Sequence, residues 1–345
     1  MRGIIARRVA LAVLALATTV APAGAQEPQD GAFQSYLAEV GRRAVAQGVA
    51  PATVARELAG LTLNTRVIEL DRGQPGNVQS TSFSPFAPYR RDHVDAARIG
   101  RGRTVYQAQR GRLAAIERET GVPESIMVAI WGHETNYGSY TGNFDLVRSL
   151  ASLAFEGRRR ALFEGELIAA LKMVDRGVPR SQLKGSWAGA TGNPQFLPSI
   201  YLRLARDGDG DGRADIWTSQ ADTLASIANY FTNAGWRPGQ PWGVAVSVPA
   251  GYDRSAVANR LVSPRCPRVF QRHSGWRSVA EWRRLGISAL GRALPADDVQ
   301  ATLIEPDGEG QTAYLITGNY RVILDYNCSN FYALSVGLLA DAVET

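Results

Sequence analysis

The sequence predicts a mainly α-helical protein with a small β part near its C-terminus. Two observations support this fold class: apolar residues recur at helical spacing through the first two thirds of the chain, and short strand-like runs appear in the last third. Helices are expected within 30–60, 93–120, 144–154, 162–174 and 222–235. Strands are expected at 244–249, 299–304, 313–317 and 320–325, before a closing helix at 330–343.

The N-terminus has the pattern of a secretory signal peptide. Arginines precede an apolar run at 9–20, which ends at the small-residue site Ala23-Gly24-Ala25. We therefore expect residues 1–25 to be removed and the mature protein to be periplasmic. The apolar run is too short for a comfortable membrane span, and no cysteine stands near the cleavage site, so no membrane anchor is expected.

The mature chain is expected to divide into two parts. Residues 26–88 form an N-terminal helical segment that ends in a loop rich in Gly, Pro, Ser and Gln, and residues 89–345 form the main domain with the β part. The net charge is +6, of which three signal-peptide arginines supply half. This mild charge gives no reason to expect nucleic-acid binding. We expect the protein to be a monomer.

An acidic loop has the spacing of the first half of an EF-hand. Asp207, Asp209 and Asp211 alternate with other residues, and Gly212 stands at the sixth position, where a sharp turn is needed. The twelfth position is Thr218 instead of the usual Glu, so Asp222 is the nearest candidate for the last carboxylate. A solvated acidic turn, a magnesium site or an empty site are alternatives, but we favour calcium.

The two cysteines, Cys266 and Cys328, leave two interpretations open. In an oxidising compartment they can form one disulfide across a long loop, and otherwise they are two small unpaired apolar residues. We favour the disulfide.

One carboxylate, Glu134, stands at the end of an apolar helical run and just before a glycine-containing turn. Apolar walls would raise its pKa and suit it to act as a general acid. For a single Glu, a solvated charge at a helix end is the simpler interpretation. The neighbouring His133 should point to another face of the helix, so we expect it to pack and not to relay a proton.

Two further stretches allow both structural and sugar-binding roles. Residues 186–198 are rich in Gly and Pro and carry Trp187 and Gln195, which suits a tight turn or a sugar site equally. Residues 326–332 cluster two phenols and two amides, and Asn330 could also be an ordinary helix N-cap.

Taken in order, these motifs resemble those of the lytic transglycosylase B family, lysozyme-like exported enzymes that cleave the glycan strands of peptidoglycan. The resemblance extends from about Pro88 to the C-terminus. The matching segments are 121–123, 134–138, 186–190, 195–199, the acidic loop to Trp217, 228–231, 235–236 and 326–332.

The resemblance implies a lysozyme-like catalytic domain with one acid/base carboxylate, Glu134, which leaves 1,6-anhydromuramoyl ends without consuming water. It also implies substrate-binding roles for Ser186, Gln195, Tyr230, Tyr326 and Asn327, with Tyr137 and Tyr332 behind them. The calcium ligands implied are Asp207, Asp209, Asp211, the carbonyl of Arg213, and Asp222.

Three alternatives stay open beside the lytic transglycosylase. A second carboxylate would point to a hydrolysing muramidase, and Asp145 is conceivable in that role, although we expect it to be structural. A protein that only binds or organises peptidoglycan, and a calcium sensor, are the other two. The single acidic loop argues against the sensor.

Overall fold

The computed structural model describes residues 26–74, 84–259 and 266–344. The expected signal peptide lies outside the described residues. Within the described part of the chain, no helix is both long and apolar enough to cross a membrane.

Helices dominate the structure, as expected, and the strands are short. The helices are α1 (Gln26–Ala46), α2 (Pro51–Leu58), α3 (Thr65–Arg72), α4 (Ala87–His93), α5 (Ala96–Ala108), α6 (Arg110–Thr120), α7 (Glu124–Thr135), α8 (Leu146–Glu156), α9 (Arg160–Asp175), α10 (Pro198–Leu204), α11 (Gln220–Asn233), α12 (Pro267–Phe270), α13 (Val279–Arg284), α14 (Gly318–Tyr326) and α15 (Asn330–Glu344). The strands are β1 (Phe144–Asp145), β2 (Lys184–Gly185), β3 (Gly243–Ser247), β4 (Arg277–Ser278), β5 (Ser288–Ala289), β6 (Gln300–Ile304) and β7 (Ala313–Ile316).

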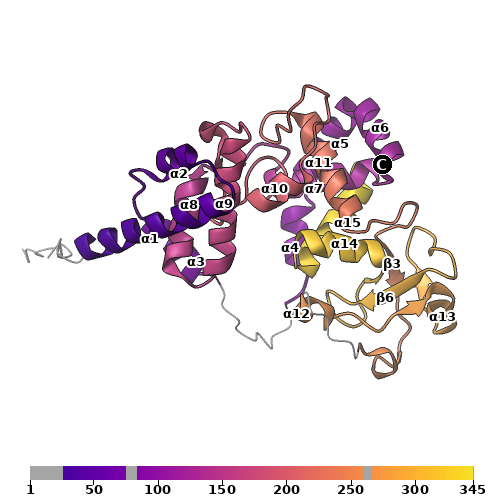
Figure 1. Cartoon of the computed structure of the whole chain (residues 1–345). Helices are drawn as coiled ribbons and strands as arrows, with labels where there is room; N and C mark the ends of the chain where they lie inside the picture. The colour runs from indigo at the N-terminus through magenta and orange to yellow at the C-terminus, as the bar shows by residue number, and fades with distance from the viewer. Residues whose placement is uncertain (1–25, 75–83, 260–265, 345) are drawn as a thin grey trace, which may run out of the picture.

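The N-terminal helices share one hydrophobic core with α8 and α9. Phe33, Leu37, Val40 and Ala44 recur at spacings of three and four along α1, so they form one buried face of that helix. Figure 1 shows α1, α2 and α3 gathered around α8 and α9. The core of segment 26–74 is therefore completed by α8 and α9, which follow α7 in the chain.

A second core surrounds α7, which is buried along almost its whole length. α5, α6, α11 and α15 pack around α7. The ring of Tyr137 packs directly on the backbone of α7 at Gly132, where a Cβ would lie 2.5 Å from the ring. The helix ends at Asn136, which has a left-handed conformation (φ 51°). Glu134 thus lies in the last turn of a central helix.

The β part forms a five-stranded antiparallel sheet in the order β4-β6-β7-β3-β5, beside α12 and α13 (Figure 1). Its own core includes Val246, Trp282 and Leu315. The strands expected at 244–249, 299–304 and 313–317 are confirmed as β3, β6 and β7.

The strand expected at 320–325 is wrong, because these residues form helix α14. The Thr317 side chain caps the helix by accepting a hydrogen bond from the N–H of Asn319. Tyr320, Ile323 and Leu324 then bury one helical face. A short apolar run with β-branched residues fits either element, and here the cap and the helical burial decide.

The disulfide between Cys266 and Cys328 is confirmed, and it ties the segment before α12 to the start of α15. Asn330, one candidate for the N-cap of α15, does not cap this helix. The hydroxyl of Ser329 accepts the hydrogen bond from the N–H of Tyr332 instead. Asn330 is buried, where its amide nitrogen donates to the carbonyl of Val269.

Candidate active site

Glu134 meets a tyrosine hydroxyl at the end of α7. The hydroxyl of Tyr332, from α15, donates a hydrogen bond of 2.6 Å to Glu134 Oε1. Burial raises the pKa of Glu134 from 4.5 to about 7, and the hydrogen bond from Tyr332 acts in the opposite direction. The raised pKa keeps a proton on part of the carboxyl groups near neutral pH, as a general acid requires.

The surroundings of this carboxyl group are aromatic. Burial raises the pKa of Tyr89, Tyr326 and Tyr332, and the negative charge of Glu134 adds to the effect in each case. These tyrosines come from α4 and from the consecutive helices α14 and α15, so two segments that are distant in the chain surround one acid. The expected rise in the pKa of Glu134 is confirmed, although tyrosines take the place of the apolar walls.

A column of stacked rings stands behind Tyr332. The Tyr89 and His93 rings are parallel with centroids 3.7 Å apart, His93 stacks on His133 at 5.7 Å, and His133 meets the edge of Tyr332 at 5.2 Å. Burial lowers the pKa of His133 to about 3, so this imidazole is neutral near pH 7. His133 is packed, as expected.

Sequence reasoning missed Tyr89 and His93. They occupy positions i and i+4 of α4, and the Nδ1 of His93 lies 2.9 Å from the carbonyl of Tyr89. A loop of the β part fixes the start of this helix, because Asp307 Oδ1 accepts a hydrogen bond from the N–H of Ala87. The aromatic pair at helical spacing was the one signal that could have identified them.

Gln195 and Tyr326 lie close together. The hydroxyl of Tyr326 donates to the carbonyl of Pro194 (2.6 Å), directly before Gln195. The amide nitrogen of Gln195 donates to the carbonyls of Thr141 and Gly192, which holds the residue at φ 49°. Two amide donors are thus used for folding, and the amide oxygen is the group that remains to meet a ligand.

The Tyr230 ring lies beside that of Tyr326. Its centroid lies 4.6 Å from that of Tyr326, and its hydroxyl donates to the carbonyl of Asp325 at 2.8 Å. The structure therefore brings together Gln195, Tyr230 and Tyr326 with Tyr332 and Glu134.

The other three expected substrate residues have different surroundings. The Ser186 hydroxyl accepts a hydrogen bond from the N–H of Ala190 and closes the tight turn. Asn327 is exposed at the end of α14. Tyr137 packs its ring against Gly132, and its hydroxyl donates to the carbonyl of Arg98 (3.1 Å), so the structure gives it a packing role.

Asp145 is held by other groups. Both of its carboxylate oxygens accept hydrogen bonds from Arg180 at 2.6 Å, and Oδ1 also caps α8 through the N–H of Arg148. These contacts agree with the structural role expected for it.

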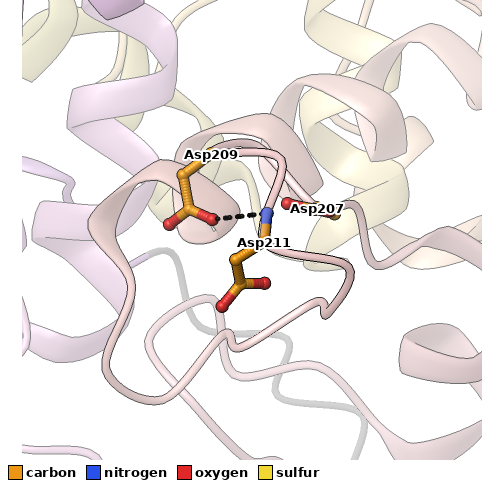
Figure 2. Close-up of side chains that lie close together, drawn as sticks. All are labelled: Asp207, Asp209 and Asp211. Atoms are coloured by element: carbon orange, nitrogen blue, oxygen red, sulfur yellow. Dashed lines mark hydrogen bonds between the residues drawn. The ribbon is translucent and has the colours of Figure 1, made fainter.

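The acidic loop gathers three carboxylates. One oxygen from each of Asp207, Asp209 and Asp211 lies within 4.8 Å of the others, and all three residues are exposed. Figure 2 shows Asp209 accepting a hydrogen bond from the backbone nitrogen of Asp211. Three carboxylates so close together fit a hard divalent cation by the chemistry of their oxygen atoms.

Asp222 has a different place from the one expected. Its side chain is fully buried, Oδ1 accepts from the N–H of Gly208 (2.8 Å), and Oδ2 accepts from the N–H of Asp215 (2.6 Å). It therefore anchors both ends of the loop and does not join the three-carboxylate group. Arg213 contributes its N–H to the loop by donating to Asp211 Oδ1.

Comparison with known proteins identifies the family of this chain. The family model described as the transglycosylase SLT domain matches residues 32–341. The chain therefore belongs to this family, the class of lytic murein transglycosylases, as its motifs predict.

Particular relatives support the same class. The chain is 32% identical over 259 residues to the membrane-bound lytic murein transglycosylase B of Escherichia coli K12, a match that covers 74% of this chain and 66% of that protein. SltB3 of Pseudomonas aeruginosa, solved in complex with NAG-anhNAM-pentapeptide, is similar with a TM-score of 0.80 and 38% identity, covering 90% of this chain and 79% of SltB3. The E. coli Slt35 structure in complex with calcium is similar with a TM-score of 0.72 and 26% identity, covering 91% and 93%.

Proposed function

We propose that this protein is a peptidoglycan lytic transglycosylase in which Glu134 serves first as acid and then as base. The observation that carries this proposal is the half-buried Glu134 carboxyl group, which accepts a hydrogen bond from Tyr332 and has its pKa raised to about 7. Such a group is partly protonated and partly ionised near neutral pH, so one residue can perform both steps.

The first step breaks the bond between N-acetylmuramic acid and N-acetylglucosamine. Protonated Glu134 donates its proton to the bridging oxygen, which leaves with the bonding electron pair as the hydroxyl of N-acetylglucosamine. Glu134 is then a carboxylate, and the hydroxyl of Tyr332 stabilises it through the 2.6 Å hydrogen bond.

The second step closes the muramoyl ring on itself. The Glu134 carboxylate removes the proton from the muramoyl 6-hydroxyl, and that oxygen bonds to the anomeric carbon. The product is a 1,6-anhydromuramoyl end, Glu134 is protonated again, and no water is consumed.

A second carboxylate is the requirement of ordinary glycosidases, as nucleophile or base. The candidate for that role, Asp145, has both oxygens bound to Arg180, which supports the single-carboxylate mechanism. A hydrolysing muramidase is the nearest alternative, and it would leave reducing ends.

The substrate wall is proposed to consist of Gln195, Tyr230 and Tyr326. The free amide oxygen of Gln195 can accept a sugar hydroxyl, and the two tyrosine rings offer flat apolar surface to a pyranose. The complex of the similar SltB3 with NAG-anhNAM-pentapeptide supports a glycan of this kind as the ligand.

The acidic loop is proposed to bind calcium in a structural role. Asp207, Asp209 and Asp211 would hold the ion, with Arg213 adding its carbonyl oxygen, while Asp222 keeps the loop closed from below. The calcium complex of the similar Slt35 supports this ion. We also propose that the protein acts in the periplasm after export, as its N-terminal sequence predicts.

The test is the release of soluble fragments from purified sacculi. Glu134→Gln keeps the shape and removes the proton, so lysis should stop while the fold and glycan binding remain. Asp145→Asn is the matched control and should still lyse. An active Glu134→Gln protein would refute the assignment, and a wild-type protein that binds sacculi without releasing fragments would indicate a non-catalytic binder.

A further inference from the structure

A pocket of about 430 Å³ lies beside α14. It is bounded by the residues that follow α11, by the residue before β4 and by the start of β6. We call it the α14 pocket. Its charged and aromatic lining residues are Arg237, Trp276, Arg321 and Asp325, and Gln300 adds an uncharged amide. The proposed cleavage chemistry uses none of these side chains.

Arg321 is a partly buried cation held by two rings. Its guanidinium carbon lies 3.7 Å from the centroid of the Phe270 ring and 5.1 Å from that of Trp276. Burial lowers its pKa to about 10, so it remains charged at neutral pH. Among the described residues, no carboxylate lies within ion-pair distance of Arg321, and its Nε has no hydrogen-bond partner.

Removing a cation from water without a counter-ion costs free energy, and contacts with two aromatic rings offset only part of it. The second arginine of the pocket, Arg237, lies over the start of α14, with its Cζ 3.6 Å from where a Cβ of Gly318 would be. Asp325 provides one negative charge at the other end, so the lining carries a net charge of +1. This arrangement favours an anionic ligand.

The pocket is connected to the catalytic site through α14. Tyr230, which the proposed substrate wall contains, donates its hydroxyl to the carbonyl of Asp325, and Asp325 lines the pocket. Arg321 precedes Tyr326 by five residues, which is about 8 Å along a helix axis. Three extended peptide residues span about 10 Å, so a short peptide on the bound glycan can reach the pocket.

We propose that the α14 pocket binds a carboxylate of the peptide that branches from the glycan substrate, with Arg321 as the main contact. This proposal rests on the proposed function, because that function supplies the peptide-bearing substrate. A planar carboxylate matches the fork of a guanidinium group. Trp276, which is 39% exposed, gives the aliphatic part of the peptide a surface to pack against.

The experiment compares two substrates that differ only in charge. Peptide-bearing glycan strands are used as such, or after conversion of their peptide carboxylates to primary amides, and kcat/KM is measured on each. A hydrogen bond to a charged group contributes about 1.5 to 3 kcal/mol, so amidation should lower the wild-type kcat/KM about tenfold or more, through KM.

Arg321→Met keeps an apolar stem between the rings and removes the charge. It should lower kcat/KM on native strands by the same factor and make the enzyme indifferent to amidation. Arg237→Met, on an exposed side chain, is a second variant and should show a smaller effect in the same direction. The control Arg118→Met, on the exposed face of α6, should behave as wild type.

An Arg321→Met protein that loses equal activity on both substrates, or that still distinguishes them as wild type does, would overturn the proposal. If wild type cleaves neither substrate, the proposed function has failed instead. Calorimetric titration of a muramoyl peptide into Glu134→Gln, with and without Arg321→Met, then tests peptide binding by the pocket independently of cleavage. Equal affinity in the two proteins overturns it, and loss of binding in the second supports it.

Discussion

Replacing Glu134 by Gln should make the protein more stable at neutral and alkaline pH while abolishing its activity. In the folded protein the pKa of Glu134 is about 7, against 4.5 for the same group in water. Between these values the folded chain holds a proton that the unfolded chain has released, so wild-type stability falls as the pH rises.

The magnitude follows from the two pKa values. They differ by about 2.5, and each pKa unit corresponds to 1.36 kcal/mol, so ionised Glu134 costs the folded state about 3 kcal/mol above pH 7. Gln cannot ionise, and its amide oxygen can still accept the hydrogen bond from Tyr332. The gain in stability should therefore be near zero at about pH 4 and approach about 3 kcal/mol at about pH 8.

Urea denaturation of both proteins at these two pH values measures the effect. Glu119→Gln, at an exposed site on α6, is the matched control and should change the free energy of unfolding at neither pH. If Glu134→Gln gives the same free energy difference at both pH values, Glu134 is a solvated charge and its proposed environment is wrong.

Three further predictions follow from particular contacts. Tyr332→Phe removes the hydrogen bond that favours ionised Glu134, so the alkaline limb of the pH–activity profile should move up by about 1 to 2 pH units; a limb that stays or moves down contradicts the contact. Millimolar calcium should raise the melting temperature of wild type, and Asp209→Asn should weaken that rise; equal shifts in the two proteins would exclude the loop as the site. Replacing Cys266 and Cys328 together by Ser should cost about 2 to 5 kcal/mol in the free energy of unfolding, because the disulfide closes a separation of 62 residues; an unchanged denaturation midpoint would show that the bond does not form.

Local sequence patterns predicted much of this molecule, because their signals lie within a few residues of each other. The alternating carboxylates of the acidic loop and the strand-like runs of the sheet are of this kind. The apolar run before Glu134 also predicted its raised pKa, but the tyrosines that surround the carboxyl group come from α4, α14 and α15.

What the sequence did not reveal depends on partners far away in the chain. The rings of His93 and His133 connect Tyr89 to Tyr332, and no local pattern links these positions. Asp222 was expected to bind the ion, but two loop N–H groups required a buried acceptor. Such roles follow from tertiary packing and from the need to satisfy buried donors.

The central claim is that Glu134 alone closes an anhydro ring on the muramoyl residue. Mass spectrometry of the glycan fragments released from purified sacculi tests it most directly. The account predicts wild-type fragments that are one water lighter than hydrolysis products and end in 1,6-anhydromuramic acid, with none released by Glu134→Gln. Fragments with reducing muramoyl ends would contradict it and identify a hydrolase.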